Sequence, residues 1–461
     1  MTTRFPFRAA ILIAFEGVFI VAALVVAASI RFGEWTPDLL FSSSGAWRIL
    51  LVVLVTQGCL YYADLYNLQL VAERRELFIR LLQALAAASL ILAVLYYWLP
   101  DLVIGRGVFL LASVLIFAEV VGWRLVWEWL AKRIGPQERL LIVGTNQMAA
   151  TLASELFERR HELGVEIVGF VDPDPSKVGE RMINPGVVGT IEDIPSIVRA
   201  RGVDRVVVSL VDARGKLPME KLLEMKLDGV TFDHLPSVYE EYTGKIAVEN
   251  LRPSWLIFSS GFRKSRTQAA VKRSLDVAMA AGGLIVGAPL FAVIAVAVRL
   301  TSPGPVFYHQ KRVGLRGHIF SVHKFRSMRQ DAEAVTGAVW ASPAGDSRVT
   351  PIGGFLRRTR LDELPQLWNI LKGEMSFVGP RPERPEFVTN LTQMIPYYGQ
   401  RHVIRPGLTD WAQVCYAYGA STEDALQKLQ YDLFYIKNFS VGLDLYILFE
   451  TIKTMVLRKG A

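Results

Sequence analysis

Four long apolar runs, each with few charged residues, lie in the N-terminal part of the chain. They cover residues 9–30, 47–66, 81–100 and 104–130. A helix needs about 20 predominantly apolar residues to cross a bilayer, so each run is long enough to do so. The last run carries Glu119 and Arg124, and ionisable groups at membrane depth usually face other helices. The pattern therefore predicts a bundle of four transmembrane helices within residues 1–133.

Basic residues gather in alternate connections between these runs and set the predicted orientation. They are Arg4 and Arg8 before the first run, Arg74, Arg75 and Arg80 between the second and third, and Lys132, Arg133 and Arg139 after the fourth. Because cytoplasmic loops are enriched in Lys and Arg, both ends of the bundle and the rest of the chain are expected to face the cytoplasm. The first run is not expected to be a cleaved signal peptide, because it lacks a small-residue cleavage site and further apolar runs follow.

From residue 137 to 235 the pattern changes to short apolar runs that alternate with amphipathic stretches. The runs at 139–144, 165–172 and 204–210 are typical of buried strands, and 147–160 is typical of an amphipathic helix. Strands that alternate with helices predict a parallel, Rossmann-like sheet.

The turn after the first predicted strand keeps only the first glycine, Gly144, of the dinucleotide fingerprint GxGxxG. Without the second glycine, a close approach of the backbone to a pyrophosphate is hindered. Asp172 ends the second strand, where an acid could meet a ribose, but many strand ends carry an Asp for other reasons. A regulatory or spacer role is therefore favoured over cofactor binding, which stays open.

The composition fits a membrane protein with anionic partners. Of 461 residues, 52% are hydrophobic and 20% are charged, and the mean hydropathy is +0.31. The net charge of +8 fits contact with an anionic membrane surface or anionic substrates. No nucleic acid partner is expected, because zinc-finger spacing, an RNP motif and long basic runs are missing from the sequence. Cys59 and Cys415 lie in different contexts, which argues against a disulfide, and the six histidines show no metal-ligand spacing.

The apolar run 272–300 is long enough to cross the membrane once more, but its details favour a helix that enters and returns on one side. Gly282, Gly283 and Gly287 loosen its middle, and Pro289 lacks a backbone donor and bends a helix. Charged residues flank both ends: Lys272, Arg273 and Asp276 before the apolar centre, and Arg299 after it. We predict a re-entrant helix here, preceded by a connector at 236–271 whose aromatic and basic residues suit a membrane interface.

Charge is concentrated in the stretch from Arg357 to Pro382. Four arginines, at positions 357, 358, 360 and 381, accompany the adjacent acids Asp362 and Glu363. Since Pro365 fits only the first turn of a helix, a helix should start close to Asp362 and place both acids at its positive end, which favours their ionised forms. Carboxylates ringed by guanidinium groups suggest a site that holds and attacks phosphate. A simple helix cap beside a solvated basic face is the alternative.

The string LDELPQLWNILKGEMSFVGPRP (361–382) resembles the signature of the bacterial sugar transferases, the membrane phosphoglycosyl transferases. The likeness begins at Lys272-Arg273-x-x-Asp276, continues through 302–314, 320–328 and IRPGLTDWAQV (404–414), and covers about 272–461. Asp410 stands where the family usually has glycine, so the turn there is expected to differ slightly. Ala288-Pro289 stands where many members have Ser-Pro.

The resemblance implies transfer of a sugar-1-phosphate from a UDP-sugar to undecaprenyl phosphate with release of UMP, the first membrane step of exopolysaccharide biosynthesis, at the bacterial inner membrane. By the same resemblance, Asp362 is the nucleophile that forms an aspartyl-phosphosugar, and Glu363 binds Mg²⁺. The expected phosphate-binding residues are Arg357, Arg381 and Arg405, with Lys324, Arg326 and Arg348 as further candidates. Large members of the family also have four spans and an α/β module, and they tend to form homodimers.

The expected fold is thus an α/β membrane protein with a four-helix transmembrane bundle (1–133), a Rossmann-like domain (137–235), a connector (236–271) and a phosphoglycosyl transferase domain (272–461) that contains the re-entrant helix. Three other functions stay open: a membrane glycosyltransferase that releases UDP, a scaffold for polysaccharide assembly, and a sugar-nucleotide dehydratase or epimerase. The last lacks a TxxxYxxxK-like set in 137–235. Sugar choice is expected to depend on residues 331–347 and 383–400, with glucose or galactose as the guess.

Overall fold

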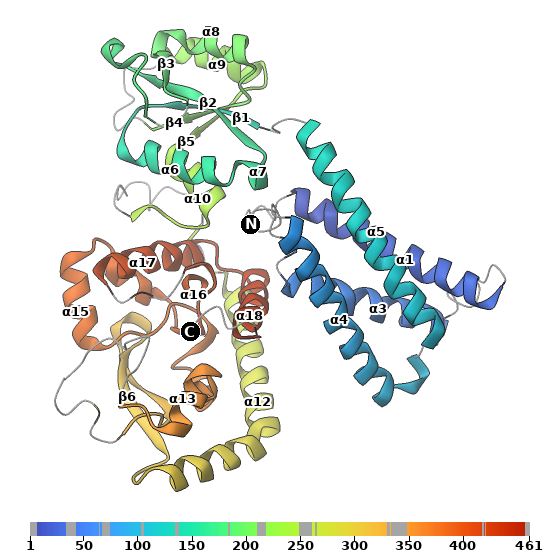
Figure 1. Ribbon diagram of the computed structural model, residues 1–461. Helices are drawn as coiled ribbons and strands as arrows, with labels where there is room; N and C mark the ends of the chain where they lie inside the picture. Colours follow the sequence, from blue (N-terminus) through green and yellow to red (C-terminus); the bar gives the residue numbers. More distant parts are fainter. Residues whose placement is uncertain are drawn as a thin grey trace. The chain divides into compact units, whose positions relative to one another are not determined.

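The computed structural model describes residues 7–33, 43–63, 65–66, 74–102, 106–133, 138–182, 185–209, 218–248, 261–262, 265–329, 332, 348–416, 419 and 421–456. The chain forms two units, Thr2–Thr243 and Gly244–Ala461 (Figure 1). The first contains a helical bundle and an α/β region, and the second contains the acidic pair predicted as the site.

The bundle consists of α1 (Phe7–Phe32), α3 (Ser43–Tyr62), α4 (Arg74–Trp98) and α5 (Arg106–Arg133), with a short 3-10 turn at Pro100–Leu102. The first three contain runs long and apolar enough to cross a membrane, which agrees with the prediction. Among the described residues, the fourth such helix is α12 (Arg266–Thr301) rather than α5. A crossing by α5, which packs along α1, stays a prediction.

Arg124 of α5 faces into the bundle. Its guanidinium lies 2.8 Å from Oε1 of Glu16 on α1 and donates to the carbonyl oxygen of Leu65 at 2.6 Å. Both charged side chains are buried. A buried charge is tolerated only with a partner, so this ion pair fixes α1 against α5.

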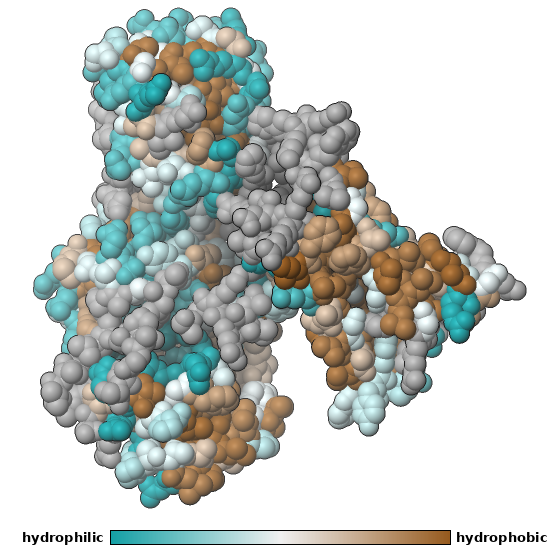
Figure 2. Space-filling model, viewed as in Figure 1, coloured by the Kyte–Doolittle hydropathy of each residue, from teal (hydrophilic) through white to brown (hydrophobic). Residues whose placement is uncertain are grey.

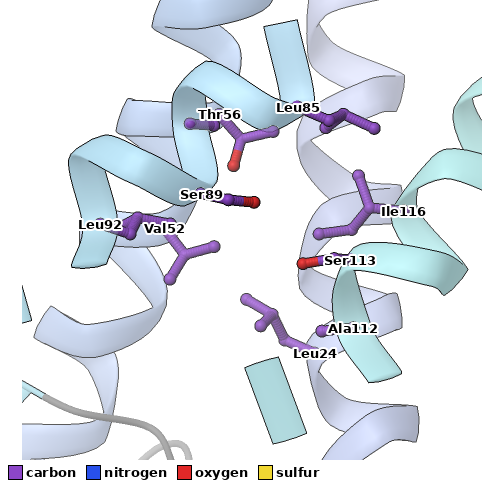
Figure 3. A pocket seen from close by; sticks show the side chains of 10 residues that line it. Leu24, Val52, Thr56, Leu85, Ser89, Leu92, Ala112, Ser113 and Ile116 are labelled. Carbon is purple, nitrogen blue, oxygen red and sulfur yellow. The ribbon is translucent and has the colours of Figure 1, made fainter. Parts of the chain in front are cut away.

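A second polar feature of the bundle is a small cavity with three hydroxyl groups. Thr56 of α3, Ser89 of α4 and Ser113 of α5 point toward it between leucine, isoleucine and valine side chains (Figure 3). Small polar residues of this kind allow helices to approach closely within a membrane.

The α/β region contains a five-stranded sheet, and the predicted parallel arrangement is confirmed. Its strands β1 (Glu138–Val143), β2 (Val165–Asp172), β3 (Val187–Thr190), β4 (Arg205–Val208) and β5 (Thr231–His234) are ordered β3-β2-β1-β4-β5. Its helices are α6 (Gln147–Glu158), α7 (Arg160–Leu163), α8 (Ile194–Arg201), α9 (Met219–Leu227) and α10 (Leu235–Thr243). α8 and α9 cover one face and α6 and α10 the other (Figure 1), so the central strand β1 is apolar on both sides.

The second unit is built around α12 and a series of short elements. These are the antiparallel pair β6 (Phe307–Val313) and β7 (Ile319–Phe325), the helices α13 (Pro351–Arg358), α14 (Gln366–Lys372) and α15 (Pro385–Met394), the parallel pair β8 (Ser376–Val378) and β9 (Gly407–Thr409), the 3-10 turns η7 (Leu361–Glu363) and η8 (Tyr398–Val403), and the helices α16 (Trp411–Cys415), α17 (Thr422–Lys437) and α18 (Val441–Val456). Every residue of α17 from Leu429 to Ile436 is buried, so α17 is a core helix and not a membrane-surface one.

Both halves of α12 pack on this same unit. Ala280 lies in a cluster with Leu367 and Ile370 of α14, and Val298 lies in another with Phe325 and Leu356. Between them several apolar side chains are exposed, among them Ile285 at 75% and Val286 at 82%. The helix turns part-way along its length (Figure 1), and hydrophobic residues gather where it turns (Figure 2). Pro289, the one proline inside α12, has no N–H to continue the helical hydrogen bonds.

The residues predicted as the charged flank of this helix are its anchors to the unit. Lys272 forms an ion pair of 2.7 Å with Asp444 of α18. Arg273 donates to the carbonyl oxygens of Ile370 and Leu371 at 2.6 and 2.8 Å, which caps the C-terminal end of α14. Asp276 is buried and accepts a hydrogen bond of 3.1 Å from the backbone N–H of Phe377, the middle residue of β8.

Candidate active site

The acidic pair lies on η7, between α13 and α14. The prediction that a helix starts close to Asp362 was wrong: α14 starts at Gln366, with Pro365 as its N-cap. Asp362 and Glu363 are both buried on the preceding 3-10 turn. Arg360, with φ of 54°, adopts a left-handed conformation that ends α13 and directs the chain into this turn. Such a conformation is costly for a non-glycine residue and is often found at functional sites.

Three cations surround Glu363. Its Oε1 accepts hydrogen bonds from Lys324 Nζ at 2.7 Å and from Arg381 Nη2 at 2.9 Å. Arg360 Nη1 lies 3.7 Å from the other oxygen, Oε2. Burial disfavours the charged carboxylate, but the three cations outweigh it and hold the pKa of Glu363 far below its usual value.

Asp362 is shifted in the opposite direction. Burial, followed by the charge of Glu363, raises its pKa to about 6, although Lys324, Arg357 and Arg381 oppose the rise. The expectation that both acids favour their ionised forms is therefore confirmed for Glu363 and wrong for Asp362. The seven-residue helix α14 begins beyond the pair, and burial beside a second carboxylate dominates instead. Two neighbouring acids with separated pKa values are typical of catalytic sites.

The structure brings together some of the predicted phosphate-binding residues. Lys324 of β7 and Arg381 of the loop after β8 meet at Glu363, and the charge of Arg357 of α13 acts on Asp362. Arg381 keeps a third of its side chain exposed and Lys324 a fifth, so both remain accessible from solvent.

Arg326 and Arg405 have other partners. Arg326 is buried and donates to the carbonyl oxygens of Ser302 and Pro303 at 2.7 and 2.8 Å, so it fixes the end of α12. Arg405 donates to the carbonyl oxygen of Gly373 at 2.8 Å, at the end of α14 away from the acids.

Arg348 lies at the border of the described chain. Its side chain donates to the carbonyl oxygen of Ala332 at 3.5 Å. The proposed sugar-selecting stretch 331–347 lies, apart from Ala332, outside the described residues.

Asn369, which the sequence reading did not single out, fixes α14 against β7. Its Nδ2 donates to the carbonyl oxygen of Ser321 and to Glu374, both at 2.7 Å, and its Oδ1 accepts from the N–H of His323 at 3.1 Å. The side chain is fully buried. This contact sets the spacing between Lys324 and Glu363, and a lone polar residue within an apolar helical run was its signal in the sequence.

The pairing of β8 with β9 shapes the loop that carries Arg381. A side chain at Gly407 would clash with the backbone of Gly379, so glycine is required for this approach. Asp410, just after β9, has an extended backbone (φ −141°, ψ 164°), so the expected difference from a glycine turn is wrong: the position needs no positive φ. Arg401 and Asp432 also lie behind this loop, and the sequence reading missed both.

Glu363 is the candidate metal ligand within this site. Among the described residues, no group of three or more His, Cys, Asp or Glu side chains could hold a metal ion. Mg²⁺ does not need such a group, because it is commonly bound by one or two carboxylates with waters and substrate phosphates. Glu363 is ionised, and among the described residues its Oε2 has only the longer contact to Arg360, so this oxygen fits such a mode of binding.

At the carboxyl end of the parallel sheet, polar side chains are engaged with one another. Thr145 donates to Asp172 at 2.5 Å, and Lys177 lies 3.4 Å from the same carboxylate. Asn146 caps α6 and donates to the carbonyl oxygen of Ser209 at 2.6 Å. These contacts hold Asp172 at the end of β2, and cofactor binding at this edge of the sheet stays open.

In comparisons with known proteins, two family models match separate parts of the chain. The family model of the bacterial sugar transferases matches residues 267–458, and that of a CoA-binding domain matches residues 61–217. A UDP-glucose:undecaprenyl-phosphate glucose-1-phosphate transferase of Xanthomonas campestris pv. campestris is 33% identical over 70% of this chain and 68% of its own.

Two other relatives match half of the chain or less. A UDP-N-acetylgalactosamine-undecaprenyl-phosphate N-acetylgalactosaminephosphotransferase of Aeromonas hydrophila is 42% identical over 50% of this chain, which spans 53% of that protein. The exopolysaccharide production protein PSS of Rhizobium leguminosarum bv. phaseoli is 39% identical over 41% of this chain and 96% of its own length.

Proposed function

The chain belongs to the bacterial sugar transferase family and is a phosphotransferase, and we propose that it transfers a sugar-1-phosphate from a UDP-sugar to undecaprenyl phosphate. The observation that carries this proposal is the pair of adjacent buried carboxylates beside Lys324 and Arg381. The pKa of Asp362 is raised and that of Glu363 is lowered. The cations can bind phosphate oxygens, and Asp362, the acid with the raised pKa, can act as the nucleophile.

The reaction has two displacements at phosphorus. A carboxylate oxygen of Asp362 attacks the β-phosphorus of the UDP-sugar, the bond from that phosphorus to the bridging oxygen breaks, and UMP leaves. A phosphate oxygen of undecaprenyl phosphate then attacks the same phosphorus, the bond to Asp362 breaks, and the free carboxylate is restored. The product is an undecaprenyl diphosphate sugar.

Two steps through Asp362 avoid a direct meeting of two anionic substrates. Each displacement still builds negative charge on phosphate oxygens, which preorganised cations stabilise. Arg381 and Lys324 lie closest to the acids, and Arg357 adds its charge from α13. Arg405 and Arg326 are assigned instead to holding α14 and α12.

Glu363 would hold Mg²⁺ through Oε2. When bound, the ion would neutralise part of the pyrophosphate charge. Glu363 also keeps Lys324 and Arg381 in place, since both donate to its Oε1.

The membrane arrangement of α12 is proposed to be re-entrant. A straight helix of 36 residues would be about 54 Å long. Both halves of α12 instead pack on one unit, and the exposed apolar residues lie between them. With both ends on the cytoplasmic side, the acidic pair would meet its nucleotide-activated substrate there and the lipid phosphate at the membrane surface.

The decisive experiment incubates the purified chain in nanodiscs with Mg²⁺, a short polyprenyl phosphate and a panel of UDP-sugars, and identifies the released nucleotide. UMP release that is lost in Asp362→Asn, together with loss of a phosphosugar adduct on the protein, is the expected result. UDP release would mean glycosyl transfer and would exclude the aspartyl intermediate. The Xanthomonas and Aeromonas relatives are named for different sugars, glucose and N-acetylgalactosamine, so the panel must include N-acetylhexosamines as well as glucose and galactose.

A further inference from the structure

A second arginine, Arg401, supports Arg381 and is more deeply buried. Arg401 of η8 donates from Nη2 to the carbonyl oxygen of Arg381 at 3.1 Å. It also lies 2.8 Å from Asp432 of α17 and donates to the hydroxyl of Tyr398 at 2.6 Å. The Arg401 side chain is 5% exposed, which is far less than that of Arg381. Arg401 therefore belongs to the support of the site and does not itself reach substrate.

Two carboxylates lie in the same buried layer. Asp410 and Asp432 are only 3% and 2% exposed. Asp410 accepts a 2.6 Å hydrogen bond from the N–H of Gln413, so its side chain is fixed at the start of α16. The strands bring it near the site, because Gly379 donates its N–H to the carbonyl oxygen of Thr409 at 3.1 Å and Gly407 donates to that of Pro380 at 3.0 Å.

Charges of both signs face this pair. The cations are Arg381 from the loop after β8, Arg401 from η8 and Lys428 from α17, and the other acid is Glu383. The negative charge of Glu363, and then those of Asp410 and Glu383, raise the pKa of Arg381, so Asp410 stabilises the charged form of Arg381 together with Glu363.

We propose that Asp410, Asp432 and Arg401 are positioning residues that hold Arg381 toward Glu363 and the substrate phosphates. The inference rests on the proposed function, since it assigns a support to one of its phosphate-binding residues. When the carboxyl pair carries its full negative charge, Arg381 and Arg401 are held firmly, and when the pair is partly protonated, they are held less well.

The pair should change its charge near neutral pH. Burial raises the pKa of Asp432 to about 7, with a smaller contribution from the negative charge of Asp410, and burial also raises the pKa of Asp410. The KM for the UDP-sugar should therefore decrease as the pH rises through about 7, and then level off.

The test compares Asp410→Asn with Asp424→Asn in the full chain in nanodiscs. Asparagine keeps the helix cap of α16 but removes the charge. Asp424 caps the neighbouring helix α17 through Ser421, so its variant is a matched control that should behave as the wild type. We expect Asp410→Asn to raise KM about ten-fold with a much smaller change in kcat, and to remove the pH step near 7.

A double-mutant cycle separates positioning from general damage. In an Arg381→Gln background, Asp410→Asn should add little, because the residue that it positions is gone. A full additional loss in that background, or an Asp410→Asn variant with unchanged KM and unchanged pH profile, would overturn the inference.

A second measurement does not depend on the reaction. Because the folded pair binds protons more tightly than the unfolded chain, the wild-type unfolding temperature should fall as the pH rises from about 5 to 8. It should fall less in Asp410→Asn. Wild-type protein that releases no UMP but shows this difference would refute the proposed function and not the buried pair. If the wild-type chain releases UMP but its unfolding temperature and that of Asp410→Asn change with pH in the same way, the inference about the buried pair would be refuted and the proposed function would stand.

Discussion

At the scale of single residues, the site depends on two adjacent carboxyl groups that the fold makes chemically different. Asp362 and Glu363 share a turn and are about equally buried. Glu363 is in direct contact with Lys324 and Arg381, whereas for Asp362 the burial and the charge of Glu363 prevail. A sequence cannot show this difference, because it depends on which neighbour each oxygen faces.

The raised pKa of Asp362 predicts the acid limb of the pH profile. A protonated carboxyl cannot attack phosphorus, so kcat/KM for the UDP-sugar should fall about ten-fold per pH unit below pH 6. An ordinary Asp would keep its charge to about pH 4. The fall should continue with decreasing pH, unlike the limited change in KM expected for the buried pair. Lys324→Met should move the limb to higher pH, because Lys324 lowers the pKa of Asp362; a profile flat from pH 7 to 4.5 would contradict this assignment.

Removal of the Glu363 charge should weaken the binding of Mg²⁺. Glu363→Gln keeps the size of the side chain but replaces an anionic ligand by a neutral one, so half-maximal activity should require at least about ten-fold more Mg²⁺. Titration of activity with Mg²⁺ checks this, and Glu374→Gln is the control, since Glu374 contacts Asn369 and none of the site's cations in the described contacts. An unchanged titration in Glu363→Gln would mean that another group holds the ion.

At the scale of elements, the contact between α14 and β7 determines the site geometry. Asn369 is buried and its side chain makes three hydrogen bonds. Asn369→Ala removes these bonds, including those to the carbonyl oxygen of Ser321 and the N–H of His323, so it should cost about 1–3 kcal/mol of stability. Thermal unfolding and UMP release should both decrease. Asn390→Ala, at an exposed position of α15, should change neither.

How far the elements were predictable depends on the range of the interactions that make them. The apolar runs of α1, α3 and α4 and the strands β1, β2 and β4 follow local periodicity, and they were predicted nearly as found. The short strands β3 and β5 were not predicted. The start of α14 was not, because Pro365 can cap a helix as well as begin one. Lys324 and Arg326 were both expected to bind phosphate, but Arg326 follows the end of β7 and donates to the end of α12 instead.

At the scale of the whole molecule, the match to the family model of the bacterial sugar transferases, residues 267–458, lies within the second unit. The Rhizobium protein is covered over 96% of its length by 41% of this chain. The catalytic groups, their supports and both anchors of α12 all lie within this unit. The matched residues therefore include the acidic pair and the cations around it, while the bundle and the parallel sheet lie outside this match.

The re-entrant arrangement of α12 makes a prediction about which side of the membrane each end faces. In a chain with Cys59 and Cys415 replaced by serine, Ser265→Cys and Thr301→Cys should both react with a membrane-impermeant maleimide from the cytoplasmic side. Val286→Cys, in the exposed apolar part of α12, should be protected by the bilayer. Glu224→Cys on α9 serves as the cytoplasmic reference. Labelling of positions 265 and 301 from opposite sides would mean that α12 crosses the membrane, and the acids of η7 would then lie on the side away from the α/β module.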